Sequence, residues 1–442
     1  MPVTPLGESA RLIAQALQAR GYQAYFVGGC VRDLLLGLSP KDYDIATDAK
    51  PDQVIQLFPK ANLVGAHFGV VLVDRIEVAT FRSDHSYLDG RHPESVIFES
   101  DPKQDVLRRD FTINALLIDP QSPDIEEPVI DWVGGVADLR AGIIRAIGIP
   151  EARFQEDHLR MLRAIRFAAR LGFRIEPETM AAIRKLSKLL ARVSPERIRD
   201  ELVRILTEGG ARHGFELLDE SGLLEVVLPE VSAMQGVRQP PEFHPEGDVW
   251  THTLIMLDRM RSPSPALAWG VLLHDVGKPV TFRIAERIRF DGHVEAGERI
   301  AAAILARLRV SNEDTERVLA LIGNHMRFMD VPHMRESTLK RFLRLGHFDE
   351  HLELHRLDCS SSHGKLDTYE SVKSRFEAAP PEDLRPARLL TGKDLIAAGY
   401  RPGPLFAKML ETVEDAQLES RIRTKEEAMN LILSLYGPPT GD

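Results

Sequence analysis

The sequence predicts a mixed α+β fold for residues 1–145 and a helical fold for the rest of the 442-residue chain. Short apolar runs bounded by glycine, proline or aspartate, which are typical of strands, gather in the first part. Further along, apolar residues recur at helical spacing, as at Leu159, Leu162, Ile165 and Ala169. With 43% hydrophobic and 28% charged residues, the composition is ordinary for a soluble protein of several domains.

The expected elements follow from these patterns in chain order. We expect helices at 6–18, 31–36 and 52–58, and strands at 25–27, 68–73 and 76–81. The polar stretch Arg82–Pro93, which contains glycine and histidine, is predicted to be a mobile loop. A helix is expected from Glu156 to Phe173, and another one begins at Pro195 with Ser194 as its N-cap.

The first chemical motif lies directly after the strand at 25–27. Gly28 and Gly29 give a tight turn, and the N–H groups at the start of the next helix attract an anion, to which Arg32 adds a guanidinium. Asp42 and Asp44 follow, and residues two apart in a strand point to the same face, where paired carboxylates bind hard cations such as Mg²⁺. Alone, a Gly-Gly turn or an Asp-x-Asp strand edge is usually unremarkable. Together they favour two-metal nucleotidyl transfer with Asp42 and Asp44 as the catalytic metal ligands.

A third carboxylate is a candidate for the same metal site. Glu77 lies in the expected strand at 76–81, but alternation alone does not say which face of the sheet its side chain takes. Glu77 is therefore predicted only as a candidate ligand.

The arrangement resembles the head of the polymerase-β-like nucleotidyltransferases, and within them the class II group of tRNA CCA-adding enzymes and bacterial poly(A) polymerases. The string from Arg108 to Leu116 resembles the second signature of that group. The resemblance implies that Arg109 contacts the incoming nucleotide and that Asp110 places the sugar or orients an arginine. Gly29 and Arg32 are then expected to bind the triphosphate together with Arg109.

A row of charged residues follows on the helix expected from Glu156. Asp157, Arg160, Arg163 and Arg166 recur every three residues, and on composition alone they would form a solvated face of ion pairs. The run resembles the Glu-Asp-x-x-Arg signature of the family, which implies that Asp157 and Arg160 select the amino-bearing bases C and A over G and U. Arg163 and Arg166 would then hold phosphates or the base-selecting residues.

Another family signature occurs further along the chain. The string 194–202 resembles the fifth motif of the family, and we assign it a structural role.

A second constellation consists of histidines and carboxylates beyond residue 243, on segments that mostly have a helical pattern. The pair His274-Asp275 follows an apolar helix and precedes Val-Gly-Lys-Pro, which resembles the HD phosphohydrolase superfamily. The resemblance implies hydrolysis of 2′,3′-cyclic phosphates and phosphomonoesters, with Lys278 as a candidate oxyanion contact. The implied ligands of Mg²⁺, Mn²⁺, Ni²⁺ or Fe are His252, His274, Asp275 and Asp358, with His293 and His325 completing a second metal or contacting phosphate.

Charge and cysteine content limit the partners and the compartment. The net charge of −10 argues against a protein that coats nucleic acid indiscriminately, whereas residues 151–210 carry 13 Arg and Lys against 9 Asp and Glu and are the expected RNA contact. Cys30 and Cys359 are far apart and are expected to be reduced thiols in a cytoplasmic protein. No apolar run approaches the length of about 18 residues that spans a membrane.

These observations predict four regions, which are a nucleotidyltransferase head at 1–145, a helical neck at 146–240, an HD domain at 241–375 and a tRNA-contacting helical tail at 376–442. The favoured function is template-independent addition of CCA to the 3′ end of tRNA from CTP and ATP. Three alternatives stay open: an A-adding enzyme, a poly(A) polymerase, and an HD phosphohydrolase with an RNA-binding head. No membrane or DNA partner is expected, and the chain is expected to be a monomer or a weak homodimer.

Overall fold

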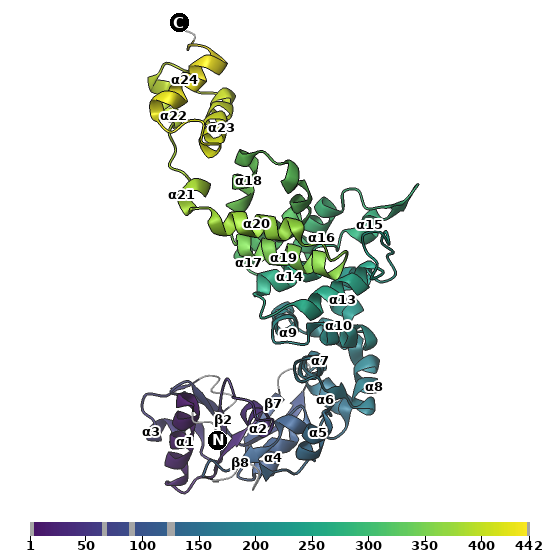
Figure 1. The fold of residues 1–442 in the computed structure, drawn as a ribbon. Helices are drawn as coiled ribbons and strands as arrows, with labels where there is room; N and C mark the ends of the chain where they lie inside the picture. Colours follow the sequence, from purple (N-terminus) through teal and green to yellow (C-terminus); the bar gives the residue numbers. More distant parts are fainter. Residues whose placement is uncertain (1–3, 64–68, 88–92, 122–128, 440–442) are drawn as a thin grey trace. The chain divides into compact units, whose positions relative to one another are not determined.

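The computed structural model describes residues 4–63, 69–87, 93–121 and 129–439, and the side chains of 84–87 and 93–95 lie outside the description. The chain divides into an N-terminal unit, Met1–Ser232 with Ala306–Val310, and a C-terminal unit, Ala233–Leu305 with Ser311–Asp442. Figure 1 shows a sheet with helices at the start of the chain and helices almost throughout the remainder. The predicted α+β class is confirmed.

The N-terminal unit begins with the sheet region. Its elements are α1 (Pro5–Gln18), β1 (Ala24–Val27), α2 (Gly29–Leu35), β2 (Asp44–Thr47), α3 (Pro51–Leu57), β3 (Asn62–Leu63), β4 (Val70–Val73), β5 (Ile76–Thr80), β6 (Arg82–Tyr87), β7 (Pro93–Phe98), α4 (Pro102–Leu107), β8 (Leu117–Ile118), β9 (Val129–Ile130), α5 (Gly135–Ala141) and β10 (Ile143–Ile144). The main sheet has the strand order β3-β4-β5-β2-β1-β8-β9. Its strands β2 and β5 are parallel, and the other neighbouring pairs are antiparallel.

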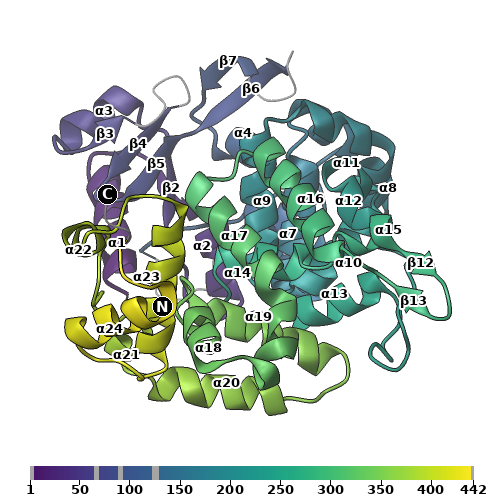
Figure 2. The same cartoon turned by 90° about the horizontal axis from the view of Figure 1, so that it is seen from above.

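The predicted loop at Arg82–Pro93 is wrong where the structure describes it. The strands β6 and β7 pair antiparallel as a separate two-stranded ribbon, in which Arg82 lies opposite Phe98 and Tyr87 lies opposite Pro93. Figure 2 shows this ribbon next to β4 and β5. Backbone pairing makes these strands although most residues of β6 are polar, so no apolar alternation marked them in the sequence. Residues 88–92 lie outside the described residues.

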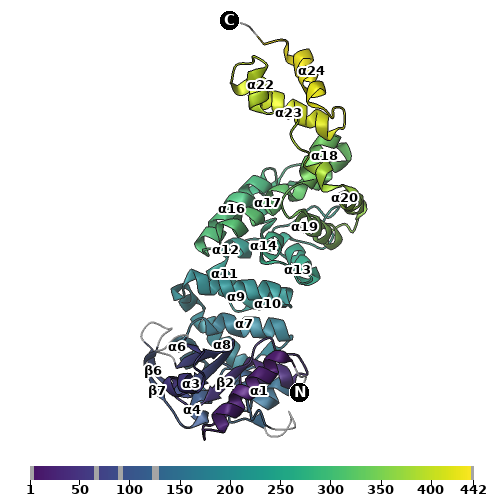
Figure 3. The same cartoon turned by 90° about the vertical axis from the view of Figure 1, so that its left-hand side faces the viewer.

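Helices complete the N-terminal unit. They are α6 (Pro150–Glu156), α7 (Arg160–Leu171), α8 (Pro177–Leu186), α9 (Pro195–Thr207), α10 (Ala211–Glu220), α11 (Leu223–Val227) and α12 (Pro229–Ser232), with the short strand β11 (Arg174–Ile175) pairing with β10. Figure 3 shows α7, α9 and α10 packed against one another. The helix α9 starts at the predicted Pro195 with Ser194 as N-cap, although the Ser194 side chain makes no capping hydrogen bond.

The single helix expected from Glu156 to Phe173 is wrong in one respect. The backbone is extended at Asp157, with φ −142° and ψ 107°, so α6 ends before Asp157 and α7 begins after it. A carboxylate oxygen of Asp157 accepts a hydrogen bond from the backbone N–H of Leu159 at 3.0 Å. Aspartate side chains compete with the helix for backbone N–H groups, which accounts for the break.

The C-terminal unit is helical apart from one small hairpin. Its elements are α13 (Val249–Arg259), α14 (Pro265–Leu273), α15 (Lys278–Thr281), β12 (Arg283–Ile284), β13 (Ile288–Arg289), α16 (His293–Arg307), α17 (Asn312–Asn324), α18 (Glu336–Leu343), α19 (Phe348–Ser361), α20 (Asp367–Ala378), α21 (Pro381–Leu384), α22 (Gly392–Ala397), α23 (Pro404–Leu418) and α24 (Lys425–Tyr436). The helices α13, α17 and α19 pack around α14, whose residues from Ala266 to Leu273 are all buried. Within the described ranges, no helix combines the length and apolarity that crossing a bilayer requires.

Candidate functional site

The Gly28 turn brings together three of the residues that the sequence singled out. Gly28 has a positive φ of 79°, a conformation that a side chain disfavours, and precedes α2 directly. A Cβ atom at Gly28 would lie 3.5 Å from Nη1 of Arg109 and 3.6 Å from Oδ2 of Asp44. The backbone of the turn, a guanidinium and a carboxylate therefore meet at the end of β1 and the start of β2.

Acidic side chains concentrate around Asp44, the first residue of β2. Asp44 pairs with Val27 of β1 on one side and with Glu77 of β5 on the other. Because directly opposed residues of neighbouring strands point to the same face, Glu77 shares the face of Asp44. This pairing supplies the orientation of Glu77 that alternation in the sequence left open. Asp42 lies in the exposed segment that leads into β2.

The pKa of Asp44 reflects this crowding. Burial raises it to about 6, the negative charges of Glu77 and Asp42 raise it as well, and the positive charge of Arg109 opposes them. A carboxylate that is crowded by two others is stabilised in its charged form by a cation. The donor set of three carboxylates is therefore of the kind that Mg²⁺ uses, which prefers oxygen ligands.

Arg32 lies beneath the Gly-Gly turn rather than exposed on it. Its side chain is 2% exposed and donates to Asp33 and, at 2.7 Å, to Asn114. A Cβ atom at Gly29 would lie 3.6 Å from Nη2 of Arg32. In this structure Arg32 supports the turn from inside, and its direct contact with phosphate stays a prediction.

Asp110 orients Arg163. Its Oδ2 accepts from Nε and Nη2 of Arg163 at 2.8 and 2.6 Å, and its Oδ1 accepts from the side chain of Asn114. Burial acts to raise the pKa of Asp110, but the charges of Arg163 and Arg160 outweigh it and lower the pKa to about 2. This arrangement agrees with the second of the two roles expected for Asp110, that of orienting an arginine.

Of the two residues expected to select the base, Asp157 lies at the break between α6 and α7, and Arg160 is the first residue of α7. Oδ2 of Asp157 accepts from Arg197 of α9 at 2.8 Å. Arg160 donates to Glu156 at 2.7 Å and to the carbonyl oxygen of Arg108 at 3.0 Å. Arg197 lies in the string to which only a structural role was assigned, and the sequence offered no signal for its contact across 40 residues.

Arg166 points into the interior of the N-terminal unit. It is 4% exposed, its Nε donates to Glu201 at 2.6 Å, and its guanidinium lies over the ring of Phe167. The helix α7 thus presents Arg163 and Arg166 to different partners, and Arg166 would have to leave Glu201 to reach a nucleotide. Its predicted role in nucleotide binding stays untested.

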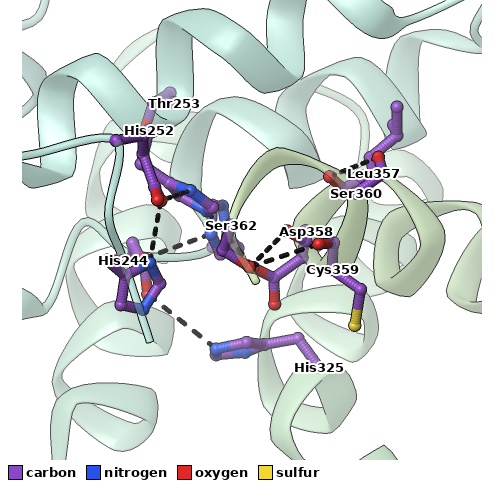
Figure 4. Close-up of polar contacts among 12 residues, drawn as sticks. His244, His252, Thr253, His325, Leu357, Asp358, Cys359, Ser360 and Ser362 are labelled. Atoms are coloured by element: carbon purple, nitrogen blue, oxygen red, sulfur yellow. Dashed lines mark hydrogen bonds and ion pairs between the residues drawn. The ribbon is translucent and has the colours of Figure 1, made fainter. Parts of the chain in front are cut away.

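The histidines and carboxylates of the C-terminal unit form one buried cluster. The ligand atoms of His252, His274 and Asp275 lie within 4.8 Å of one another, and so do those of Asp275, His293 and His325. Nε2 of His252 lies 3.2 Å from Oδ1 of Asp358, which faces it from α19 (Figure 4). The structure thus brings together all six residues that the sequence analysis named for this site.

The histidines of this cluster are oriented by the chain for metal binding. Nδ1 of His274, His293 and His325 lies within 2.7–2.9 Å of the carbonyl oxygens of Val271, Phe290 and Ile322, so each Nδ1 carries the proton. In the neutral imidazole, Nε2 is then an acceptor. Among the described residues, Nε2 of His274 and His293 is buried without a hydrogen-bond partner. Acceptors that face a carboxylate in this way fit a divalent cation between them.

Buried charges adjust the pKa values of the cluster. Burial acts to raise the pKa of Asp275, but His274 and Lys278 outweigh it and keep that pKa well below its usual range. Burial acts to lower the pKa of His252, whereas Asp358 and Glu246 raise it to about 9. The raised pKa of His252 means that Asp358 and Glu246 favour a positive charge at the place where a cation would bind.

Glu246 and His244 were not among the metal ligands that the resemblance implied. Oε1 of Glu246 lies 2.6 Å from Nδ1 of His252 and 2.9 Å from Nδ1 of His244. Figure 4 shows His244 beside His252. Carboxylates in this position orient metal-ligating histidines. No spacing rule identifies Glu246, because it acts from a loop ahead of α13.

Comparison with known proteins identifies three family models along the chain. They are the poly A polymerase head domain at 24–145, the probable RNA and SrmB-binding site of polymerase A at 172–235, and the HD domain at 248–355. The exact boundaries of the four regions stay a prediction. The HD match agrees with the cluster just described.

Individual proteins and one solved structure match over larger spans. The chain is 33% identical to the CCA-adding enzyme of Bacillus pumilus over 426 residues, which cover 94% of each chain. It is 41% identical over 237 residues to poly(A) polymerase I of Haemophilus influenzae, covering 50% of this chain and 51% of that protein. The crystal structure of the Bacillus stearothermophilus CCA-adding enzyme in complex with CTP matches with a TM-score of 0.74 and 28% identity, over 98% of this chain and 99% of that one.

Proposed function

The chain belongs to the family of CCA-adding enzymes, and we propose that it adds C, C and A to the 3′ end of tRNA from CTP and ATP with release of pyrophosphate. The observation that carries the proposal is the meeting of the Gly28 turn, Asp44 and Arg109 at one end of the sheet. A backbone without a side chain, a guanidinium and a metal-binding carboxylate are the three parts that a nucleoside triphosphate requires. The tail at 376–442 is proposed to contact the tRNA.

We assign the head metal site to Asp42 and Asp44, with Glu77 as a candidate third ligand. Burial and the crowding of these carboxylates, which together raise the pKa of Asp44 to about 6, fit a divalent cation and favour Mg²⁺. When bound, Mg²⁺ supplies activation of the attacking hydroxyl and neutralisation of the leaving pyrophosphate. Arg109 and the N–H groups of the turn at Gly29 bind the triphosphate, while Arg32 holds the turn in place through Asp33 and Asn114.

Selection of the base is assigned to Asp157 and Arg160. A carboxylate accepts from the exocyclic amino group that C and A share, and a guanidinium donates to ring nitrogen and carbonyl oxygen, whereas G and U present a carbonyl at the amino position. Arg160 is held by Glu156 and by the carbonyl of Arg108, next to Arg109. Arg163, held by Asp110, supports this wall of the site.

A poly(A) polymerase is the second candidate, favoured by the 41% identity of half of the chain to poly(A) polymerase I of Haemophilus influenzae. The matches to CCA-adding enzymes extend over 94% of the chain, which supports CCA addition more strongly. The resemblance implies that a poly(A) polymerase would carry a basic, Arg-rich string where this chain has residues 63–69, and residues 64–68 lie outside the described ranges. An A-adding enzyme shares all of these motifs.

One assay separates these activities. The protein is incubated with tRNA ending at the discriminator base, at C or at CC, with each NTP alone or with CTP and ATP together, and the 3′ ends are sequenced. CCA addition completes all three substrates, whereas an A-adding enzyme extends only the CC end and a poly(A) polymerase adds long A tails. Ends that stay unextended in every mixture would overturn the proposal.

Two variants test the assigned residues. The double variant D42A/D44A is expected to lose extension of all three tRNA ends, because no carboxylate pair remains to bind the cation. Asp157→Ala is expected to keep extension but to admit U and G. Undiminished activity of the double variant, or clean selection of C and A by Asp157→Ala, would contradict the respective assignment.

We propose further that the C-terminal unit is a metal-dependent phosphohydrolase that acts on 2′,3′-cyclic phosphates and phosphomonoesters of RNA ends. His252, His274, Asp275 and Asp358 would hold the cation, and the buried Nε2 atoms that face carboxylates fit it. Imidazole and carboxylate donors suit Mn²⁺, Ni²⁺ or Fe. Lys278 lies 2.6 Å from Asp275 and carries a positive charge toward a substrate phosphate.

The hydrolase is tested with RNA that ends in a 2′,3′-cyclic phosphate and with each metal in turn. H274A/D275A is expected to abolish hydrolysis while the addition of CCA continues. His333→Ala is the matched control, because His333 is exposed. Hydrolysis that survives in H274A/D275A would refute the assignment.

A further inference from the structure

We propose that Asp105 is a positioning residue that fixes Arg109 beside the Gly28 turn and Asp44. This inference rests on the proposed nucleotide binding by Arg109 and extends it to a residue that does not itself touch the nucleotide. Asp105 lies in α4, and its side chain is 1% exposed. It is therefore too deeply buried to bind a substrate and can act only through its neighbours.

The carboxylate of Asp105 is divided between two consecutive arginines. Oδ1 accepts from Nε and Nη2 of Arg108 at 2.9 and 2.5 Å. Oδ2 accepts from Nε and Nη2 of Arg109 at 3.2 and 2.9 Å. Each oxygen of the Asp105 carboxylate thus binds the Nε–Nη2 edge of one guanidinium group. This arrangement fixes the plane of both guanidinium groups.

This grip determines where the third nitrogen of Arg109 points. With Nε and Nη2 held by Asp105, Nη1 is directed to the Gly28 turn, where a Cβ atom at Gly28 would be 3.5 Å away. Oδ2 of Asp44 would be 3.6 Å from the same point. Arg109 thus spans the distance between a buried anchor and the place proposed for the triphosphate.

The anchor also adjoins the base-selecting residues. Arg108, the other partner of Asp105, offers its carbonyl oxygen to Nη2 of Arg160 at 3.0 Å. A shift of the segment after α4 would therefore move both Arg109 and the support of Arg160. Such coupling distinguishes Asp105 from an ordinary helical ion pair, although its spacing of three and four residues from the arginines is the ordinary one.

The test compares Asp105→Asn with wild type. Asparagine has the same shape but lacks the charge that holds two guanidiniums, so Arg109 loses its fixed orientation. Because Arg109 is proposed to bind the triphosphate, its misplacement weakens nucleotide binding, and we expect kcat/KM for CTP on tRNA ending at C to fall by about 10- to 100-fold, mainly through KM. Equilibrium binding of CTP without tRNA should weaken in parallel.

The matched control is Asp101→Ala at the N-cap of the same helix. Asp101 caps α4 by accepting from the N–H of Lys103 at 2.9 Å, so its variant perturbs the helix without touching an arginine. If the role of Asp105 is purely structural, both variants should lower Tm and leave kcat/KM and the dissociation constant for CTP within about twofold of wild type.

A double-mutant cycle with Arg109→Ala isolates the pathway. If Asp105 acts through Arg109, Asp105→Asn should change CTP binding by less than about twofold in the Arg109→Ala background. The proposal would be overturned if Asp105→Asn weakened CTP binding by the same factor in the wild-type and Arg109→Ala backgrounds. Asp105→Glu retains the charge and displaces it by one methylene, so it serves if Asp105→Asn does not fold, and unchanged CTP binding in either folded variant also overturns the proposal.

Failure of the proposed function gives a different result. If wild type does not extend tRNA, the assigned activity fails, while CTP binding by wild type and Asp105→Asn still reports on the positioning of Arg109.

Discussion

Replacing Arg166 by methionine tests whether the buried arginine of α7 stabilises the N-terminal unit. The side chains of Arg166 and Glu201 are 5% and 6% exposed, and Nε lies 2.6 Å from Oε2. Glu208 lies further from the guanidinium, at 3.7 Å, and as a second carboxylate it offers Glu201 no substitute for Arg166. Arg166→Met therefore leaves Glu201 buried without its strong partner, which costs about 3–5 kcal/mol of unfolding free energy.

The expected cost translates into a measurable shift of the thermal transition. For a unit of this size, each kcal/mol corresponds to about 2–4 °C, so Tm should fall by about 6–20 °C. Calorimetry on the full chain, with the transition of the N-terminal unit followed separately, measures this shift. The double variant R166M/E201L removes both charges and should recover most of the loss, because replacing a buried pair by apolar groups is often neutral.

The control for this prediction is an exposed pair of the same chemistry. Arg184 and Glu220 are 52% and 53% exposed at 2.6 Å, and Arg184→Met should cost less than about 1 kcal/mol. The prediction is refuted if Arg166→Met lowers the unfolding free energy no more than Arg184→Met does. It is also refuted if the loss of unfolding free energy in R166M/E201L equals the sum of the losses in its two single variants. Such results would leave Arg166 available for the nucleotide contact that the sequence suggested.

Three further predictions follow from the geometry. Nucleotide addition should be lost as pH falls through about 6, because protonated Asp44 no longer holds Mg²⁺, and more Mg²⁺ should lower that midpoint; a midpoint independent of Mg²⁺ in pH–rate profiles would contradict this. Gly277→Ala places a Cβ atom 2.1 Å from the carbonyl oxygen of His293, so the backbone at His293, a member of the histidine cluster, must shift. The affinity of this cluster for Mn²⁺, measured by calorimetry, should therefore fall about 10- to 100-fold, and an unchanged affinity would contradict the predicted clash. The pKa of Asp110 is lowered from 3.8 to about 2, so its carboxylate stabilises the fold above pH 3.8, and this stabilisation is lost as pH falls toward 2. Arg163→Met removes the partner that lowers this pKa, so the unfolding free energy of the variant should depend less on pH in this acid range. An equal pH dependence of the unfolding free energy in both proteins would contradict this prediction.

Local spacing predicted the parts of the site that depend on neighbouring residues. The order of strand, Gly-Gly turn, helix and Asp-x-Asp strand needs only backbone geometry, and β1, α2 and β2 follow it within a few residues. The carboxylate of Asp105 also lies within one helical turn of Arg108 and Arg109, so sequence spacing alone indicates this contact.

Other features depended on partners that are distant in the sequence. Parallel pairing of β2 with β5 gives Glu77 its face, and pairing of β6 with β7 makes strands of a polar stretch. Helix periodicity predicted one continuous helix through Asp157, whereas its carboxylate breaks the helix and meets Arg197 of α9. Periodicity also placed Arg163 and Arg166 in one row, although Asp110 and Glu201 draw them to different partners.

By itself, the sequence determined the chemical types of the side chains and their local order, because turns, caps and strand alternation depend on a few adjacent residues. Only the tertiary structure decided which carboxylate faces which arginine and which histidine nitrogens converge, because those contacts join segments that are far apart in the chain, as with His252 and Asp358. Burial then set the charge state of each group, since desolvation and the nearest opposite charge together fix its pKa.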